Sequence, residues 1–168
     1  ATAAFKTNAE VKDFSESFKH VAPIAAAAGM SLEETAAAIG RLTQHGIRGS
    51  MAGTTLKRSL TELIAPTGKA AKYLQAMGIE AVDAGGKIKS LPDILSQLNV
   101  AIDRLGPGAD KAGIMMEMFG MRAGPGMTAL LSETGGELAK LTAELKGVNT
   151  VTEIAKGQTD SLGGTMKK

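Results

Sequence analysis

Few residues in this sequence could perform acid–base, nucleophilic or metal chemistry. The chain has two histidines, His20 and His45, and no cysteine. Neither histidine belongs to an H-E-x-x-H pair or stands with serine and acidic residues at the spacing of a catalytic triad. The absence of cysteine excludes disulfides, thiolate nucleophiles and zinc ribbons. We therefore predict no catalytic residue, no metal site and no cofactor, and we interpret both histidines as solvated or helix-end side chains.

Residues 66–69, Pro-Thr-Gly-Lys, are similar to the end of a phosphate-binding loop. Such a loop has a glycine five positions before its second glycine, and a serine or threonine after its lysine. Leu63 and Ala70 stand at those two positions. The segment therefore predicts a loop that caps the next helix, and it does not predict a nucleotide site.

Asp83 stands just before two adjacent glycines but lacks the alternating acids of a calcium loop. Adjacent glycines permit a tight reversal, since they adopt positive φ without a Cβ clash. Short β-capable runs at residues 79–82 and 87–89 flank this turn. We predict a small β-hairpin around residues 79–89, and it must lie against helices because an isolated hairpin is marginally stable.

Basic residues outnumber acidic ones between residues 41 and 72, where Glu62 is the single acid. The six bases are Arg41, Arg48, Lys57, Arg58, Lys69 and Lys72. Two interpretations stay open: a solvated face, or a contact with an acidic partner surface or DNA. Because only Tyr73 could stack on a base nearby, we do not expect sequence-specific nucleic-acid recognition.

Methionines gather in the second half of the chain, at positions 115, 116, 118, 121 and 127. Methionine is common in hydrophobic cores, and its unbranched thioether also makes adaptable contact surfaces. The cluster therefore predicts either core packing or a face for association with another protein.

The spacing of apolar residues predicts helices over most of the chain. Capping boxes at residues 7–10 and 31–34 mark two helix starts. Pro23 and the Gly-Pro-Gly run at residues 124–126 predict breaks. The predicted helices cover residues 8–20, 31–45, 50–64, 67–77, 90–105, 110–119, 127–132 and 136–146. The fold class is therefore all-α, with the one small hairpin.

Composition indicates a helical bundle of modest stability, in which glycines interrupt the helices. The 168 residues suit one domain, yet they include four Phe, one Tyr, no Trp and 21 Gly. The core must consist of Ala, Leu, Ile and Met with close backbone contacts. We expect a helical module over residues 1–146 with the hairpin at its centre. Residues 147–168 are expected to be a linker or the start of another helix, and the whole is expected to be a fragment of a longer chain.

Several ordered segments resemble the core region of phage tail tape measure proteins. The two main ones are Gly-Met-Ser-Leu-Glu-Glu-Thr-Ala-Ala-Ala-Ile-Gly at 29–40 and His-Gly-Ile-Arg-Gly-Ser-Met-Ala-Gly-Thr-Thr-Leu at 45–56. The resemblance continues through residues 63–68, 77–86, 91–95 and 118–120, and covers roughly residues 14–131. The motif residues expected to have structural roles are Gly29, Gly40, Gly46, Gly53, Pro66, Gly78, Asp83, Gly86, Pro92 and Gly120.

The resemblance implies a non-enzymatic structural protein of the virion tail, in the tube lumen or at the tip, and in the host cytoplasm during assembly. Such proteins template tail length and leave during DNA ejection. The implied partners are other copies of the chain, the tail tube protein, tail tip or hub proteins and tail assembly chaperones. Non-specific contact with DNA and contact with the host membrane during ejection are also implied.

Two other classes of function were weighed. One is a membrane-active segment that forms or guides a DNA channel across the host envelope, although no apolar run reaches the roughly 18–20 residues that span a bilayer. The other is an enzyme such as a cell-wall hydrolase, which the absence of a recognisable catalytic constellation disfavours. Since Gly and Pro interrupt the helices, we predict a compact module and expect any length-measuring region to lie elsewhere.

Overall fold

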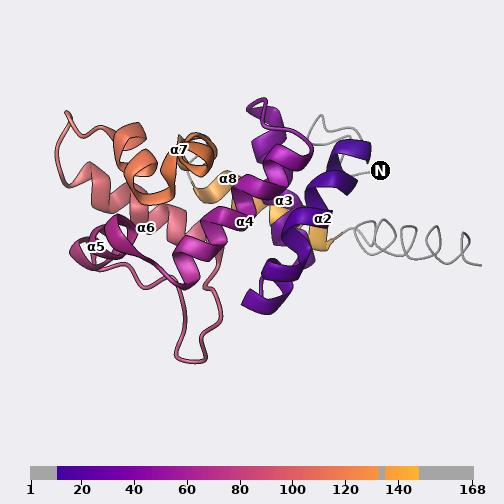
Figure 1. Ribbon diagram of the computed structural model, residues 1–168, viewed down its shortest axis with the longest axis horizontal. Helices are drawn as coiled ribbons and strands as arrows, with labels where there is room; N and C mark the ends of the chain where they lie inside the picture. Colours follow the sequence, from indigo (N-terminus) through magenta and orange to yellow (C-terminus); the bar gives the residue numbers. More distant parts are fainter. Residues whose placement is uncertain (1–10, 133–134, 148–168) are drawn as a thin grey trace, which may run out of the picture.

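A computed structural model of the chain describes residues 11–132 and 135–147. Within these residues the fold is all-α, as predicted (Figure 1). The described helices are α2 (Val11–Ala28), α3 (Leu32–Gln44), α4 (Ser50–Ile64), α5 (Gly68–Met77), α6 (Leu91–Asp103), α7 (Lys111–Ser132) and α8 (Gly135–Lys146). The predicted capping box at residues 7–10 and residues 148–168 of the predicted linker lie outside the described residues.

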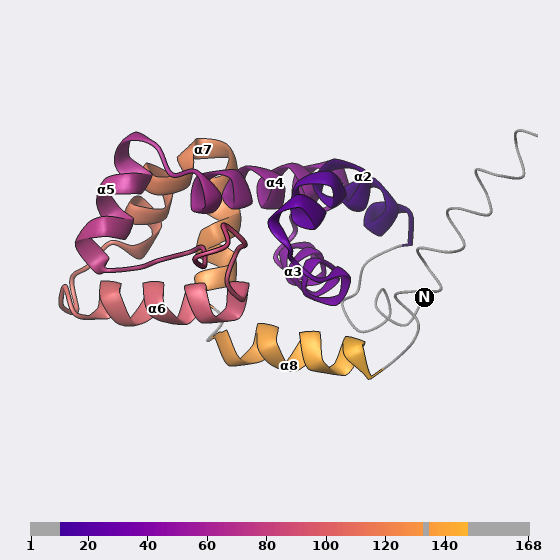
Figure 2. The same ribbon diagram turned by 90° about the horizontal axis from the view of Figure 1, so that it is seen from below.

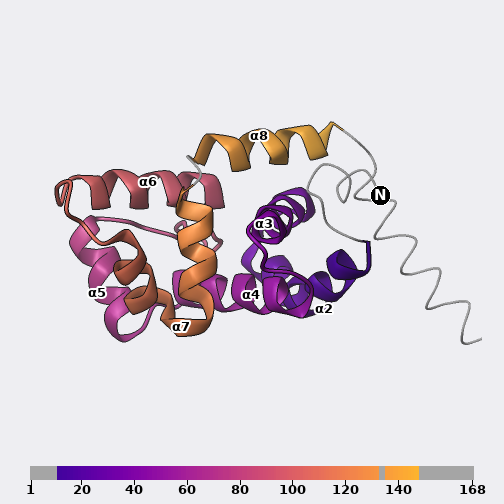
Figure 3. The same cartoon turned by 90° about the horizontal axis from the view of Figure 1, so that it is seen from above.

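Two groups of helices are joined by α4 and α8. Helices α2 and α3 form one group, and α5, α6 and α7 form the other (Figure 2). Helix α4 packs on α2 and on α7, whereas α8 packs on α3 and α6 at the opposite side (Figure 3). The core therefore runs through both groups, and α4 is the element that both share.

Helix α3 begins where its sequence predicts. The Ser31 hydroxyl accepts a hydrogen bond from the Glu34 N–H at 3.1 Å, which satisfies one otherwise unpaired donor of the first turn. The Glu34 carboxylate does not complete the predicted capping box. It accepts a hydrogen bond from the Leu91 N–H at the start of α6 instead. Burial raises the pKa of the Glu34 carboxyl, and the Leu91 hydrogen bond acts in the opposite direction.

Small residues let α2 and α4 approach closely. A Cβ atom at Gly53 would lie 2.2 Å from the backbone oxygen of Ser17, a distance that no side chain tolerates. The Ser17 hydroxyl also donates a hydrogen bond of 2.7 Å to the Gly49 oxygen. Backbone contact thus replaces the large rings that this chain lacks. Phe14 and Phe119 are the buried aromatic residues of the described core, and aliphatic side chains fill most of the rest.

The predicted β-hairpin around residues 79–89 is wrong. The described residues contain no strand, and this loop holds a single antiparallel bridge between Val82 and Ile88. Two backbone hydrogen bonds flank this bridge: the Asp83 N–H donates to Lys87 O and the Lys89 N–H donates to Ala81 O, each at 2.8 Å. Pairing does not extend beyond them, because the Ile79 N–H donates to Leu74 O at the end of α5 and the Leu91 N–H donates to Glu34. The loop projects from the helices in Figure 1.

The break predicted at Pro23 is also wrong, because α2 continues through it to Ala28. Pro23 is exposed, so its ring points away from the packed face. Ala25 and Ala28 beyond it are buried, and alanine has the highest helix propensity. Burial and propensity together offset the hydrogen bond that proline removes.

The break predicted at residues 124–126 is wrong, whereas the predicted end of a helix at residue 119 coincides with a kink in α7. The kink lies at Gly120, with φ 76° and ψ 175°, a conformation that residues with a Cβ rarely adopt. The Gly-Pro-Gly run at residues 124–126 lies inside the second half of the helix. Pro125 stands about one turn after this new start, where its missing N–H costs a single helical hydrogen bond.

Candidate interaction surface

The structure groups no set of residues for metal chemistry. Among residues 11–132 and 135–147, no three His, Asp or Glu side chains lie close enough together to hold a metal ion. His20 and His45 are exposed and lie on α2 and just after α3. The candidate sites that follow are surfaces that could contact another protein.

The basic residues between 41 and 72 do not form one patch. The Arg41 guanidinium pairs with Glu137 of α8 and is largely covered. Lys69 pairs with Glu117 of α7 at 3.1 Å. These two bases connect helices within the module. Their predicted contact with an acidic partner stays a prediction.

The other four bases are exposed. Arg48 precedes α4, Lys57 and Arg58 lie on α4, and Lys72 lies on α5. None of them forms an ion pair with another residue that the structure describes. These four stay candidates for contact with an acidic partner.

Glu117 connects α7 to α5 through two donors. It accepts hydrogen bonds from the Tyr73 hydroxyl at 2.6 Å and from the Lys69 ammonium at 3.1 Å. The Tyr73 hydrogen bond, followed by Lys69, lowers the pKa of Glu117, while the same bond raises the pKa of the Tyr73 hydroxyl. All three side chains serve this contact, so the cluster is a structural link and no acid–base pair for catalysis.

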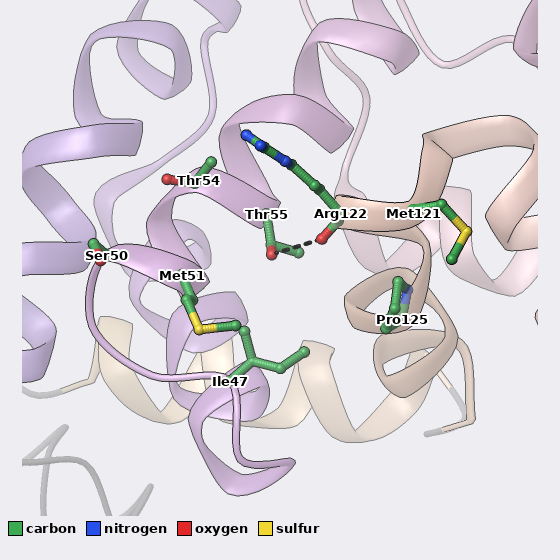
Figure 4. A pocket seen from close by; sticks show the side chains of 8 residues that line it. All are labelled: Ile47, Ser50, Met51, Thr54, Thr55, Met121, Arg122 and Pro125. Atoms are coloured by element: carbon green, nitrogen blue, oxygen red, sulfur yellow. Dashed lines mark hydrogen bonds between the residues drawn. The ribbon is translucent and has the colours of Figure 1, made fainter.

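An open groove of about 480 Å³ lies between α4 and the second half of α7 (Figure 4). We call it the α4–α7 groove. Its lining residues are Ile47, Ser50, Met51, Thr54, Thr55, Met121, Arg122 and Pro125. The Thr55 hydroxyl donates a 3.4 Å hydrogen bond to the Arg122 backbone oxygen at its edge.

Sequence reasoning missed this groove. Met51 is not part of the core, since 66% of its surface is exposed. The spacing held a usable signal: Ala52, Leu56, Leu60 and Leu63 form the buried stripe of α4 at intervals of four, four and three, and Met51 stands outside that stripe.

The methionine cluster divides between core and surface. Met115, Met118 and Met127 are buried, Met116 is half-buried, and Met121 is 78% exposed. The prediction of core packing holds for the first three. Met121 is left at the mouth of the α4–α7 groove because it directly follows the kink at Gly120.

The motif residues lie at helix ends, turns and close contacts. Positive φ angles occur at Gly29, Gly46, Gly78, Gly86 and Gly120. Gly40 and Gly53 are buried within α3 and α4, Pro66 lies between α4 and α5, and Pro92 lies in the first turn of α6. The Asp83 carboxylate accepts hydrogen bonds from the N–H groups of Gly85 and Lys87. A shared role for these positions stays a prediction.

Residues 1–120 match the family of phage-related minor tail proteins. The match covers more than two thirds of the 168 residues, so the chain belongs to this family and is a component of phage tails. The chain is 36% identical over its whole length to the tape measure protein of Pneumococcus phage Dp-1. It is 37% identical over 96% of its length to the probable tape measure protein of Escherichia phage P2. The resemblance drawn from the sequence is therefore confirmed.

The chain spans only a small part of these relatives, 15% of the first and 20% of the second. No solved structure matches it. Across the described helices, none is both long enough and apolar enough to cross a bilayer.

Proposed function

We propose that this chain is a compact helical module of a tape measure protein, a non-enzymatic part of the phage tail. The observation that carries the proposal is the identity of 36–37% with a tape measure protein and a probable tape measure protein over nearly all of the chain. The full protein would lie in the tail tube or at its tip. It would template tail length during assembly and leave when DNA is ejected.

The helices support a module that shapes or joins parts and does not itself measure length. A ruler needs length in proportion to residue number, and a continuous helix supplies about 1.5 Å per residue. Here α2 has 18 residues, or about 27 Å of helix, before the chain reverses. The longer helix α7 is kinked at Gly120. The measuring region would therefore lie outside residues 1–168.

The partners in this role would be other tail components: further copies of the chain, the tail tube protein, tip or hub proteins and assembly chaperones. The exposed bases Arg48, Lys57, Arg58 and Lys72 are proposed to face acidic surfaces of such partners or passing DNA. Reversing Arg48, Lys57 and Arg58 to Glu should lower the yield of complete tails. Unchanged yield and infectivity would assign these bases to a solvated face.

The test of the module is a deletion in the phage that encodes this chain. Removing residues 68–103 takes out α5, the loop and α6. Because α5 contributes the buried Leu74 and α6 contributes several buried leucines and isoleucines, the module should unfold and tails should fail to assemble. A matched control removes the same number of residues from the remainder of the full-length protein. Electron microscopy should find shortened tails only in that control.

Viable phages with tails shortened in proportion to the 68–103 deletion would contradict the proposal. The expected shortening for a ruler would be about 54 Å, at about 1.5 Å per residue. A peptidoglycan-cleaving activity of the purified chain would contradict its non-enzymatic part.

A further inference from the structure

We infer that the α4–α7 groove binds an amphipathic helix that carries acidic side chains beside its apolar face. This inference goes beyond the proposed function and does not depend on it, because it concerns binding by the purified chain.

Two methionines from separate helices make the groove apolar at its mouth. Met51 of α4 is 66% exposed and Met121 of α7 is 78% exposed. Ile47 and Pro125 lie beside them in the lining (Figure 4). Scattered exposed apolar residues are normal, but two that share one hollow mark a binding surface. Methionine adapts its shape to a partner at little cost, which suits a groove that receives side chains.

The lining of the groove carries positive charge. Arg122 is the only charged residue among the described residues that line it. Arg48 directly follows the lining residue Ile47. Neither of these two arginines forms an ion pair with a residue in the described part of the chain.

The open form of the groove favours side chains of a helix over a small molecule. Its volume of about 480 Å³ would suit either occupant. A small-molecule site, however, encloses most of its ligand, whereas this groove is open to solvent. An amphipathic helix would insert apolar residues at positions i, i+3 or i+4, and i+7. Acids flanking that stripe would meet the arginines.

Other occupants fit these observations less well. A second copy of the chain carries a net charge of +2, so it offers no overall charge complementarity. The phosphates of duplex DNA would pair with the arginines, but they would not pack against the apolar side chains of Met51 and Met121. Both occupants are tested in the same experiment.

The experiment measures fluorescence anisotropy of a labelled peptide of about 16 residues, or about 24 Å of helix, mixed with the purified chain. The probe peptide carries Leu on one face and Glu on both flanks, and the control peptide carries Lys in place of Glu. We expect the Glu peptide to bind at least about tenfold more tightly than the Lys peptide at low salt. Equal binding of the two peptides, or no binding of either, would overturn the inference.

Variants connect the binding to the groove. Met51→Gln combined with Met121→Gln, and separately Arg122→Glu, should each weaken Glu-peptide binding by about tenfold or more. All three residues are exposed, so the thermal transition should not move. Matched controls are Leu105→Gln, a 63% exposed apolar residue beyond α6, and Lys140→Glu, an exposed base on α8. Both controls should bind like the parent chain.

A control variant that weakens binding as much as the groove variants would overturn the inference. Duplex DNA that displaces the peptide in an arginine-dependent and methionine-independent way would assign the surface to DNA instead. Self-association that is lost in the Met51→Gln, Met121→Gln chain would assign it to a second copy.

Discussion

Helix α4 contacts α2 through backbone atoms and contacts α7 through side chains. At Gly53 an added Cβ would lie 2.2 Å from Ser17 O, whereas at Gly126 of α7 it would lie 2.4 Å from the methyl carbon of Thr55. Backbone atoms cannot move without shifting a whole helix, but a methyl group can turn. The α2–α4 crossing is therefore closed and rigid, while the α4–α7 contact leaves an open groove beside it. Helix α4 thus stabilises the fold on its α2 side and lines an open groove on its α7 side.

The largest expected effect comes from Gly53→Ala at the closed crossing. The added methyl must push α2 and α4 apart, and overpacking typically costs about 1–3 kcal/mol or more. We expect the upper end of that range, about 3 kcal/mol, because the obstructing atoms are backbone atoms of Ser17. Alanine recovers about 1 kcal/mol of helix propensity, which leaves a net loss of about 2 kcal/mol in the free energy of unfolding. Urea denaturation followed by circular dichroism measures it.

The matched control is Gly136→Ala on α8, where an added Cβ would meet no atom within 4 Å. This change should leave stability equal or raise it by up to about 1 kcal/mol. Equal effects on stability at Gly53 and Gly136 would contradict a close backbone contact between α2 and α4 at Gly53.

A smaller effect is expected from Gly126→Ala at the α4–α7 contact. The methyl carbon of Thr55 must move, and Leu42 Cδ2, which would lie 3.1 Å from the added Cβ, must shift slightly. We therefore expect a loss of about 1 kcal/mol in the free energy of unfolding. Thr55→Ser removes that methyl group and keeps the hydroxyl, so it should restore most of the lost stability. A double-mutant cycle without coupling between residues 55 and 126 would contradict this account of the contact.

Glu34 tests the contact between the two groups of helices. Burial raises its pKa above the ordinary value of 4.5, so the charged carboxylate weakens the folded state at neutral pH. The contribution of the protonated Glu34 carboxyl to stability is fully present below pH 4.5. It is lost as the pH rises through the folded-state pKa. Glutamine keeps an acceptor for the Leu91 N–H without a charge.

We therefore expect Glu34→Gln to be modestly more stable than the parent chain at pH 7, with the difference disappearing below pH 4.5. Urea denaturation at a series of pH values measures it. A variant that is less stable at pH 7, or a difference that does not change with pH, would count against a carboxyl group with a raised pKa.

The smallest effect is expected for the ion pair between Arg41 of α3 and Glu137 of α8. The Glu137 side chain is 62% exposed, and pairs of this kind contribute about 0–1 kcal/mol. Arg41→Gln, Glu137→Gln and the double variant should give a coupling below about 1 kcal/mol that decreases with added salt. A coupling several times larger would make α8 a stronger link between the groups than we describe.

Local signals in the sequence were sufficient to predict most helix ends. Ser31 caps α3, Ser50 begins α4, and Gly78 ends α5 in a left-handed conformation. Each of these depends on one residue and its near neighbours. The core of aliphatic residues and methionine was also predictable, because the chain has so few rings.

What the sequence could not reveal depends on contacts between distant segments. Pairing between residues 81–83 and 87–89 does not extend into a hairpin, because the Leu91 N–H bonds to Glu34 of α3, far away in the sequence. The spacing of apolar residues on α4 places Met51 outside the buried stripe. No local pattern encodes that α7 borders this side of α4, so the groove was not predicted.

The central claim is that the described helices, α2 to α8, form a compact module that does not measure tail length. The most direct test inserts a helix-forming segment of about 20 residues after Gly108, in the exposed connection between α6 and α7, in the phage that encodes this chain. Tail lengths are then measured by electron microscopy. We predict an unchanged mean length, and tails longer by about 30 Å would contradict the account.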